Sequence, residues 1–234
     1  MNIISFEEIP STNLWCRQNI SLLRHGDVVM SRRQSAGRGR KQRVWSSEDG
    51  GLYFSLILKE GLSGLKAPGV LTQLMALSVC KAVNALGAKS YIKWPNDVLS
   101  QGKKFCGILS EAVFNGIRLE GVIIGAGINL SQKIIKSDKP FITLAELGIN
   151  VQPQTLLEQV CSNFEEYYSL LQKDGFTALR GEYKKAFGYL GRQVTLHIFE
   201  DTFTGTAQDI DCEGRLILNT DKGLKTVNIG DMDF

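Results

Sequence analysis

The sequence predicts an α+β fold in which a large mixed domain precedes a small all-β module. Three patterns support this prediction: strand-like apolar runs such as Gly51–Leu58, a helical repeat of apolar residues over Val70–Leu86, and short alternating segments after Gly188. A chain of 234 residues is long enough for one large and one small hydrophobic core. We therefore expect domains at residues 1–188 and 189–234.

The composition is that of an ordinary globular protein. Charged residues make up 22% of the chain and hydrophobic residues 43%, which disfavours disordered, collagen-like and coiled-coil classes. The net charge is only +3, and much of the basic excess falls within Arg32–Arg43. This local concentration indicates an anion site rather than a surface for bulk nucleic-acid binding.

Cysteine and histidine usage narrows the chemistry further. The five cysteines are widely spaced without a C-x-x-C pair, and the chain has only two histidines. Disulfide frameworks, zinc sites and His-centred catalysis are therefore disfavoured. The N-terminus lacks the basic and apolar regions of a signal peptide, and the apolar runs are of strand length. We expect a cytoplasmic protein with no membrane segment.

The first expected elements are two strands separated by a basic stretch. Gly26–Ser31 and Gly51–Leu58 are rich in strand-forming residues and bounded by turn formers, so Ser31–Trp45 is expected to be a connecting loop. A helix follows over Val70–Leu86, and Gly87 is a suitable C′ residue for it.

A short strand and a hairpin come next. Tyr91–Trp94 predicts a strand that is broken by Pro95, because proline cannot donate to a strand ladder. Lys104–Phe114 and Ile117–Asn129 predict two strands joined by Asn115-Gly116 in a type I′ turn, since both residues tolerate positive φ angles.

Two helices and a β module complete the chain. Pro153 suits the first turn of a helix whose apolar face extends to Leu171, and Phe176–Phe187 has a second helical repeat. Beyond Gly188, alternating stretches separated by turn sequences predict short strands.

The basic stretch contains candidate anion-binding side chains interleaved with Gly37 and Gly39. These side chains are Arg38, Arg40, Lys41 and Arg43. The glycines allow backbone N–H groups to approach an anion, so one interpretation is a phosphate or carboxylate cradle and the other is a solvated basic loop. Neither a Walker A loop nor a G-x-G-x-x-G fingerprint is present, which disfavours the common nucleotide-binding folds.

Other groups each have functional and purely structural interpretations. Ser11-Thr12-Asn13 offers hydroxyls and an amide for a ureido or amide ligand, or a helix N-cap. Asp97 suits a metal site, the orientation of a lysine, or an Asx turn. Lys104 either points inward to stabilise negative charge or is solvated. Gly125–Asn129 is typical of a strand end that a ligand or another backbone approaches closely.

The sequence shows no pattern for a conventional nucleophile. It has no Ser-His-Asp order, no G-x-S-x-G elbow and no cysteine near a histidine. Cationic groups suit the activation of a carboxylate by ATP, in which two anions are brought together and pyrophosphate is expelled. Mg²⁺ is the divalent ion expected for such a reaction.

Several motifs, in this order and spacing, closely resemble those of the biotin protein ligases. They are Ser11-Thr12-Asn13, QSAGRGR from Gln34, Trp45, LYFSL from Leu52, KWPND from Lys93, KKFCGIL from Lys103 and GAGIN from Gly125. The resemblance covers almost the whole chain. It implies a mixed catalytic domain like that of class II aminoacyl-tRNA synthetases, followed by an SH3-like β barrel.

The resemblance also implies a two-step reaction and the residues that perform it. Biotin would be activated by ATP to biotinyl-5′-AMP and transferred to a specific lysine of a biotin carboxyl carrier domain. Lys104, Arg40 and Asp97 would be the catalytic residues. Biotin would be bound by Ser11, Thr12, Asn13, Gln34, Arg38, Gly39, Arg40 and Lys104. ATP would be bound by Arg38, Arg40, Arg43, Trp45 and Asn129. Mg²⁺ would be required, although its ligands are not indicated.

Two departures from the family pattern affect the expectations. Many members read G-R-G-R-x-G-R, whereas Gln42 replaces the third glycine here, so a stiffer loop is expected. The Ser-Thr-Asn motif begins at residue 11, which leaves no room for the N-terminal helix-turn-helix of some members and implies a short form that does not bind DNA. The expected carrier belongs to acetyl-CoA carboxylase or a similar protein, and a homodimer remains open.

Two rival functions are weighed against biotin ligation. A lipoate or octanoyl ligase or transferase of the same fold would share the chemistry of Lys104 but need a pocket for an aliphatic chain. An RNA-binding module would use Arg32–Arg43 with Trp45 as a stacking platform. This second rival leaves Ser11–Asn13 and Lys104 without a role.

Overall fold

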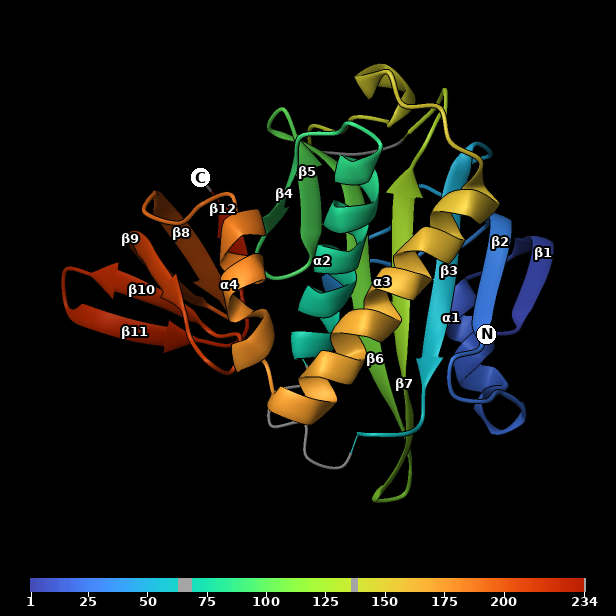
Figure 1. Ribbon diagram of the computed structural model, residues 1–234, viewed down its shortest axis with the longest axis horizontal. Helices are drawn as coiled ribbons and strands as arrows, with labels where there is room; N and C mark the ends of the chain where they lie inside the picture. Colours follow the sequence, from blue (N-terminus) through green and yellow to red (C-terminus); the bar gives the residue numbers. More distant parts are fainter. Residues whose placement is uncertain (63–68, 136–138, 234) are drawn as a thin grey trace.

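Residues 3–129 supply all the strands of the larger sheet. The computed structural model describes residues 1–62, 69–135 and 139–233. Seven strands lie in the order β1-β2-β3-β7-β6-β5-β4 (Figure 1), with β1 parallel to β2 and the other neighbours antiparallel. They are β1 (Ile3–Ile9), β2 (Val28–Gln34), β3 (Gly51–Leu58), β4 (Ser90–Lys93), β5 (Asp97–Ser100), β6 (Lys103–Asn115) and β7 (Arg118–Asn129).

Helices cover both faces of this sheet, which is why β3 is buried along its whole length. Helix α1 (Thr12–Gln18) packs on one face, and α2 (Gly69–Ala85) and α3 (Pro153–Asp174) pack on the other (Figure 1). Side chains alternate along a strand, so Ile57 belongs to the core under α1 whereas Leu56 and Leu58 belong to the core under α2 and α3. The α1 face keeps space for a ligand at its open end.

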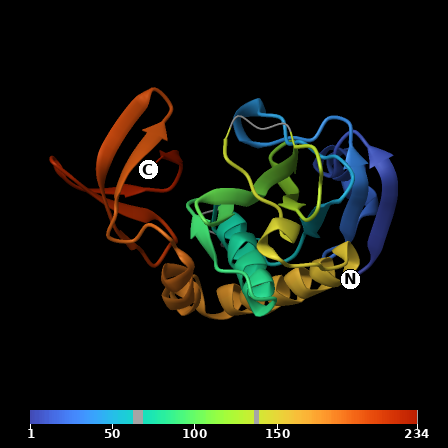
Figure 2. The same cartoon turned by 90° about the horizontal axis from the view of Figure 1, so that it is seen from above.

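The C-terminal module is a five-stranded antiparallel sheet in the order β11-β10-β9-β8-β12. Its strands are β8 (Gln193–Ile198), β9 (Asp201–Ile210), β10 (Leu216–Thr220), β11 (Gly223–Val227) and β12 (Asp231–Asp233). Figure 2 shows this sheet beside the larger one, reached through α4 (Thr177–Ala186). The last strand, β12, runs back along β8 and returns the chain to the larger domain.

The predicted α+β class and the C-terminal β module are confirmed, and most predicted elements lie within a few residues of the observed ones. The basic stretch is only partly a loop, because β2 continues to Gln34 and pairs with β1 there. The remainder of the basic stretch includes the short 3₁₀ turn η2 (Arg40–Gln42). The structure has two further 3₁₀ turns in the described residues, η1 (Ile20–Leu22) and η3 (Ala145–Leu147).

The predicted hairpin is confirmed but its turn was assigned wrongly. Asn115 pairs with Arg118, so the two central turn residues are Gly116 and Ile117. Only Gly116 of these has a positive φ, 59°, which is the pattern of a type II′ turn rather than type I′. Strands β1 and β5 were not predicted, because β1 mixes charged and apolar residues and β5 has only four residues.

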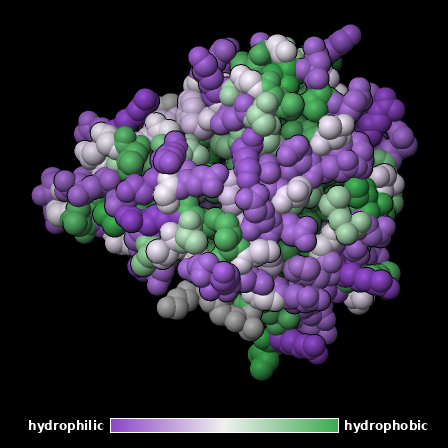
Figure 3. Space-filling view, viewed as in Figure 1, coloured by the Kyte–Doolittle hydropathy of each residue, from purple (hydrophilic) through white to green (hydrophobic). Residues whose placement is uncertain are grey.

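The tip of the β6–β7 hairpin carries exposed apolar side chains. Phe114 and Ile117 are exposed there, and hydrophobic side chains gather at the lower end of the face in Figure 3, where Figure 1 shows the hairpin. Hydrophilic side chains cover most of the remaining face. Within the described residues, no helix is long and apolar enough to cross a membrane.

Candidate active site

A pocket of about 830 Å³ lies at the open end of the α1 face, in the size range of small-molecule sites. It is formed by the start of α1, the loop after β2, the end of β4, the start of β5, the first half of β6, the last residues of β7 and the first residues of β12. Every residue that the resemblance assigns to the site lines it: Ser11, Thr12, Asn13, Gln34, Arg38, Gly39, Arg40, Arg43, Trp45, Asp97, Lys104 and Asn129. Their contacts with ligands remain predictions. Lys41, the other candidate of the basic stretch, does not line it.

One end of the pocket is a buried network of neutral polar groups. Ser11 caps α1, because its Oγ accepts a hydrogen bond from the Leu14 N–H at 3.4 Å, and it also lines the pocket. Gln34 Oε1 accepts from the Thr12 N–H at 2.8 Å and lies 3.2 Å from Thr12 Oγ1. Gln34 Nε2 donates to Ser47 Oγ at 2.8 Å. The two interpretations of Ser11, cap and pocket residue, are therefore compatible.

Asn13 is held from three sides within the same network. Its Nδ2 donates to the Leu109 carbonyl at 3.2 Å and to Glu111 Oε2 at 2.8 Å. Its Oδ1 accepts from the fully buried Ser55 Oγ at 2.6 Å, and this hydroxyl also lies 2.8 Å from Thr12 Oγ1. The amide is thus oriented by the protein before any ligand arrives.

Glycines on the strands below make room for these side chains. A β-carbon at Gly125 would clash with Asn13 Oδ1, and one at Gly127 would clash with the indole of Trp45. A β-carbon at Gly107 would crowd both Trp45 and the Lys104 ammonium. The predicted close approach to the Gly125–Asn129 strand end is therefore made by side chains of this chain.

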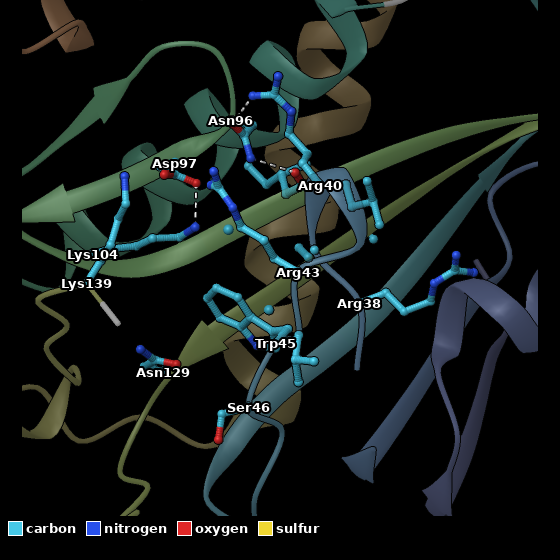
Figure 4. A pocket seen from close by; sticks show the side chains of 18 of the residues that line it. Arg38, Arg40, Arg43, Trp45, Ser46, Asn96, Asp97, Lys104, Asn129 and Lys139 are labelled. Carbon is cyan, nitrogen blue, oxygen red and sulfur yellow. Dashed lines mark hydrogen bonds and ion pairs between the residues drawn. The ribbon is translucent and has the colours of Figure 1, made fainter. Parts of the chain in front are cut away.

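Lys104 stands between the neutral end and a cationic end. Its Nζ lies 2.6 Å from Asp97 Oδ1 and 5.1 Å from the centre of the Trp45 ring (Figure 4). Its side chain is 28% exposed, so it points into the pocket rather than into bulk water. Of the alternatives for Asp97, the orientation of a lysine matches this ion pair. Burial lowers the pKa of the neighbouring Lys93, an effect that the negative charge of Asp97 opposes.

The basic loop is held by the C-terminal module. Arg40 donates to Asn96 Oδ1 at 2.8 Å and to the Gly230 carbonyl at 3.0 Å. Asp231 lies 3.2 Å from Arg40, 2.9 Å from Lys41 and 3.3 Å from Arg43. Ion pairs to one carboxylate of β12 thus organise three side chains of the basic stretch, although two of them are half-exposed.

The charge state of Asp231 follows from this arrangement. Its side chain is 16% exposed, and burial by itself would raise its pKa. The hydrogen bond to Lys41 and the charges of Arg40, Lys41 and Arg43 outweigh burial and hold the pKa of Asp231 below its ordinary value. Asp231 is therefore an ionised carboxylate that pairs with three cationic side chains at the pocket mouth.

The loop backbone is strained at Lys41 and Gln42, and Gln42 is the position where the resemblance predicts a glycine. Lys41 and Gln42 have φ angles of 52° and 59°, in the left-handed region that favours glycine.

The remaining site residues differ in their contacts. The side chain of Arg38 extends away from those of Arg40 and Arg43 in Figure 4. Trp45 Nε1 is buried and has no hydrogen-bond partner among the described residues, so it is available to a ligand. Asn129 Oδ1 accepts from Gln132 Nε2 at 3.3 Å.

Several residues of the site were missed by sequence reasoning. They are Ser47, Ser55, Asn96, Glu111 and Asp231. A carboxylate within the apolar segment of β6 was a usable signal for Glu111, because charged residues in covered strands are normally paired. Asp231 carried no comparable signal, since it follows a glycine in a short acidic C-terminus and is 188 residues from its partner Arg43.

Few groups at the site suit a metal. Among the described residues, no three His, Cys, Asp or Glu side chains form a group that could hold an ion. Asp97 and Asp231 are the pocket carboxylates in the described part of the chain, and each pairs with a cation.

Comparisons with known proteins identify the family of the chain. Residues 4–129 match the Biotin/lipoate A/B protein ligase family, and residues 189–234 match the Biotin protein ligase C terminal domain. The chain is 34% identical over 217 residues to the bifunctional ligase/repressor BirA of Bacillus subtilis, covering 89% of this chain and 66% of that protein. It is 30% identical over 218 residues to the biotin–[acetyl-CoA-carboxylase] ligase of Paracoccus denitrificans, covering 88% of this chain and 89% of that protein.

The fold is similar to that of a solved biotin protein ligase. The Aquifex aeolicus enzyme in complex with biotin and ATP superposes with a TM-score of 0.88 at 29% identity, covering 99% of this chain and 97% of that one. The chain thus spans about two thirds of the Bacillus relative and nearly all of the Aquifex structure. The expected resemblance is confirmed: the protein belongs to the biotin/lipoate A/B protein ligase family, and its C-terminal module matches that of the biotin protein ligases.

Proposed function

We propose that the protein is an ATP-dependent biotin protein ligase, which forms biotinyl-5′-AMP and transfers the biotinyl group to a lysine of a biotin carboxyl carrier domain. One observation carries this proposal: a single pocket joins a neutral hydrogen-bonding end to a cationic end, with Lys104 between them. Biotin has the same order of groups, a neutral ureido ring at one end and a carboxylate at the other.

The neutral end offers complements to a ureido group. Asn13 presents Oδ1, an acceptor for a ligand N–H, because both protons of its Nδ2 are used within the protein. Ser11 Oγ accepts from Leu14, which leaves its own proton for a ligand carbonyl, and Gln34 Nε2 has a second N–H beyond the one given to Ser47. A ligand carrying both N–H donors and a carbonyl satisfies these groups together.

Lys104 and the basic loop would bring the reacting anions together. In the first step a carboxylate oxygen of biotin forms a bond to the α-phosphorus of ATP, and the bond from that phosphorus to pyrophosphate breaks. Lys104 would hold the carboxylate, and Asp97 fixes the position of the ammonium group. Arg38, Arg40 and Arg43 would offset phosphate charge, so catalysis is chiefly positioning and charge neutralisation.

The second step needs the carrier lysine and protection from water. The lysine nitrogen bonds to the acyl carbon, the bond from that carbon to AMP breaks, and the amine loses a proton to solvent. Trp45 lies over the glycines of β6 and β7, where it and Asn129 would flank the adenine. Gly39 lets the loop pass close to the ligand. Closing of this loop would exclude water that hydrolyses the anhydride.

Mg²⁺ fits this site as a companion of ATP rather than as a resident ion. Mg²⁺ is usually bound by one or two carboxylates together with substrate phosphates and water. Asp97 and Asp231 are the carboxylates available to it in the described pocket lining. When bound with ATP, the ion would offset charge on the departing pyrophosphate.

The rival functions suit the pocket less well. A lipoyl or octanoyl group has no ureido carbonyl, so it would leave the Ser11 O–H and the second N–H of Gln34 without partners, at a cost of about 1–3 kcal/mol each. RNA binding by the basic stretch is disfavoured, because Arg40, Lys41 and Arg43 are gathered on Asp231 at the pocket mouth.

The proposal extends to the organisation of the protein. Residues 1–188 would form the catalytic unit and residues 189–234 the C-terminal module, acting in the cytoplasm on a carrier domain of acetyl-CoA carboxylase or a similar protein. No DNA-binding role is proposed. A homodimer formed through the larger sheet would use its edge strand β1, because the other edge strand, β4, makes a bridge to Phe187.

A transfer assay tests the proposed function. The protein is incubated with radiolabelled biotin, ATP, Mg²⁺ and a carrier domain, and label in the carrier is counted. We expect label that depends on ATP and is lost when the target lysine of the carrier is changed to arginine. No incorporation of biotin, together with incorporation of labelled lipoate, would refute the proposal.

A further inference from the structure

Glu111 lies outside the pocket lining, yet it contacts a residue that lines the pocket. It belongs to β6, two positions beyond Leu109, so both residues face α1. Glu111 Oε2 accepts from Asn13 Nδ2 at 2.8 Å, and Glu111 Oε1 lies 2.9 Å from Arg17 Nη2. Its side chain is 18% exposed, whereas that of Arg17 is 41% exposed. The carboxylate is thus directed inward, with the arginine on its solvent side.

The spacing of α1 explains how one carboxylate reaches both partners. Asn13 and Arg17 are four residues apart, so they lie on the same face of the helix, one turn apart. Both side chains of this face reach β6, where Glu111 and Leu109 offer oxygen atoms. The helix therefore presents a neutral amide to the pocket side and a cation to the outer side of the same carboxylate.

These contacts decide which end of the Asn13 amide faces inward. An amide can be rotated so that its oxygen and nitrogen exchange places, with little change of shape. An ionised carboxylate and a backbone carbonyl only accept, so they hold Nδ2 and would repel Oδ1. Ser55 does not choose between the two orientations, because its hydroxyl donates or accepts. Glu111 and Leu109 together fix the orientation.

We propose that Glu111 is a positioning residue for ligand recognition: it locks Asn13 with Oδ1 over Gly125, where it accepts from an N–H group of the ligand. This inference rests on the proposed biotin function. Gly125 lines the pocket and a β-carbon there would clash with Asn13 Oδ1, so this oxygen borders the ligand space. A reversed amide would present a donor to the ureido N–H and reject it. Glu111 thereby contributes to selection of ureido over aliphatic ligands without touching either.

Two variants at Glu111 test this role. Glu111→Leu removes the acceptor, and Glu111→Gln keeps the shape while allowing its amide to hold Asn13 in either orientation. We expect the Kd for biotin, measured by isothermal titration, to rise about tenfold in Glu111→Leu and about threefold in Glu111→Gln. The KM for ATP stays within about twofold of the wild-type value in both, because the phosphate end is untouched.

A matched control separates this role from a general loss of stability. Glu120 lies on the neighbouring strand β7 and accepts from Asn115 at 3.3 Å, away from the pocket lining. Glu120→Leu is expected to leave both constants unchanged. Thermal unfolding of each variant by circular dichroism shows whether it is folded, and if Glu111→Leu is not, the threefold change in Glu111→Gln decides the test.

The possible results separate this inference from the proposed function. A wild-type protein that neither binds nor transfers biotin refutes the proposed function. A wild-type protein that uses biotin, with Glu111 variants that keep the wild-type Kd, refutes the role of Glu111 alone. Parallel increases in the biotin Kd and the ATP KM would also refute it, because they indicate a general disturbance of the fold.

Discussion

The two ends of the pocket are built in opposite ways. At the neutral end, Asn13 and Ser55 are buried and hydrogen-bonded within the protein, and their supports come from α1 and the centre of the sheet. At the cationic end, Lys41 and Arg43 are 50% and 58% exposed and are held by ion pairs to Asp231 of the C-terminal module. The difference indicates that the neutral end is complete without ligand, whereas the cationic end must exchange one anion for another.

This contrast has a physical cause. Neutral hydrogen bonds need close geometry, which rigid strands and helices supply. Phosphate recognition depends on charges that act over longer distances and tolerate a changing loop. The glycine-interleaved loop can therefore release Asp231 and take up a triphosphate. Lys104, at the junction of the two ends, belongs to the rigid part through its pairing with Asp97.

The largest effect is expected for Lys104→Ala. The change removes the cation placed for the biotin carboxylate and leaves Asp97 without its partner. We expect the rate of biotin-dependent pyrophosphate release to fall by about 100-fold or more. Lys103→Ala is the control, because Lys103 is exposed and does not line the pocket. If the rate of Lys104→Ala were within about fivefold of the wild-type rate, Lys104 would not be the residue that holds the biotin carboxylate.

Arg40→Ala should weaken retention of the intermediate. Arg40 links the loop to Asn96, to the Gly230 carbonyl and to Asp231, and would face the adenylate phosphate. We expect biotinyl-5′-AMP to dissociate about tenfold faster, measured as radiolabel retained after rapid gel filtration. Arg33→Ala is the matched control, because Arg33 pairs with Glu8 on β1 and β2. Equal retention in both variants would contradict a clamping role for the loop.

Asp231→Asn should have smaller effects of opposite sign on binding and stability. Without the competing carboxylate, we expect the KM for ATP to fall by about threefold. The substitution also removes ion pairs, at a cost of at most about 1 kcal/mol because water screens the half-exposed partners Lys41 and Arg43. An unchanged or higher KM for ATP would show that Asp231 organises the cations for ATP instead of competing with it.

The stability difference between wild type and Asp231→Asn should decrease at low pH. The pKa of Asp231 is lowered from 3.8 in the folded protein, so its contribution is present above pH 3.8 and is lost as pH falls through the lowered value. We expect urea midpoints of wild type and Asp231→Asn to differ equally at pH 6 and pH 8 and to converge below pH 3.8. A difference that changes between pH 6 and pH 8 would require another titrating group.

The smallest effect is expected for Gln42→Gly. Gln42 has a φ of 59°, and glycine adopts this angle without the strain of about 1 kcal/mol that a side chain incurs. The greater freedom of glycine in the unfolded chain offsets part of the gain. We expect a rise in melting temperature of a few degrees at most. Gln42→Ala keeps the strain and is the control, and equal melting temperatures for the two variants would show that the loop relaxes elsewhere.

Local patterns predicted much of the fold and the position of the pocket. The run Gly51–Leu58 and the helix at residues 69–85 depend on neighbouring residues, so their periodicity was sufficient. Ser11 and Lys104 could be predicted as site residues because each belongs to a short motif of adjacent residues. The turn after Asn115 was misassigned by one residue, because the hairpin register shifts at a bulge between Val113 and Phe114 and pairs Asn115 with Arg118.

Supporting residues could not be predicted because they act across long sequence separations. Ser55 meets Asn13 from 42 residues away, and Glu111 meets it from 98 residues away. Asp231 reaches Arg43 across 188 residues, after the chain has formed a separate sheet and returned. Tertiary packing creates these pairs, and neither composition nor periodicity records which polar residues will meet.

Amide hydrogen exchange tests the contrast between the two ends most directly. Exchange is followed by mass spectrometry for the protein alone, with biotin, and with biotin plus a non-hydrolysable ATP analogue. We expect residues 37–45 to exchange rapidly without ligand and to gain strong protection only when both ligands are bound. Peptides covering α1 and β3 should be protected throughout and change little. Loop protection that is already complete in the free protein, with protection of α1 and β3 that appears only on binding, would contradict a preformed neutral end and an exchangeable cationic end.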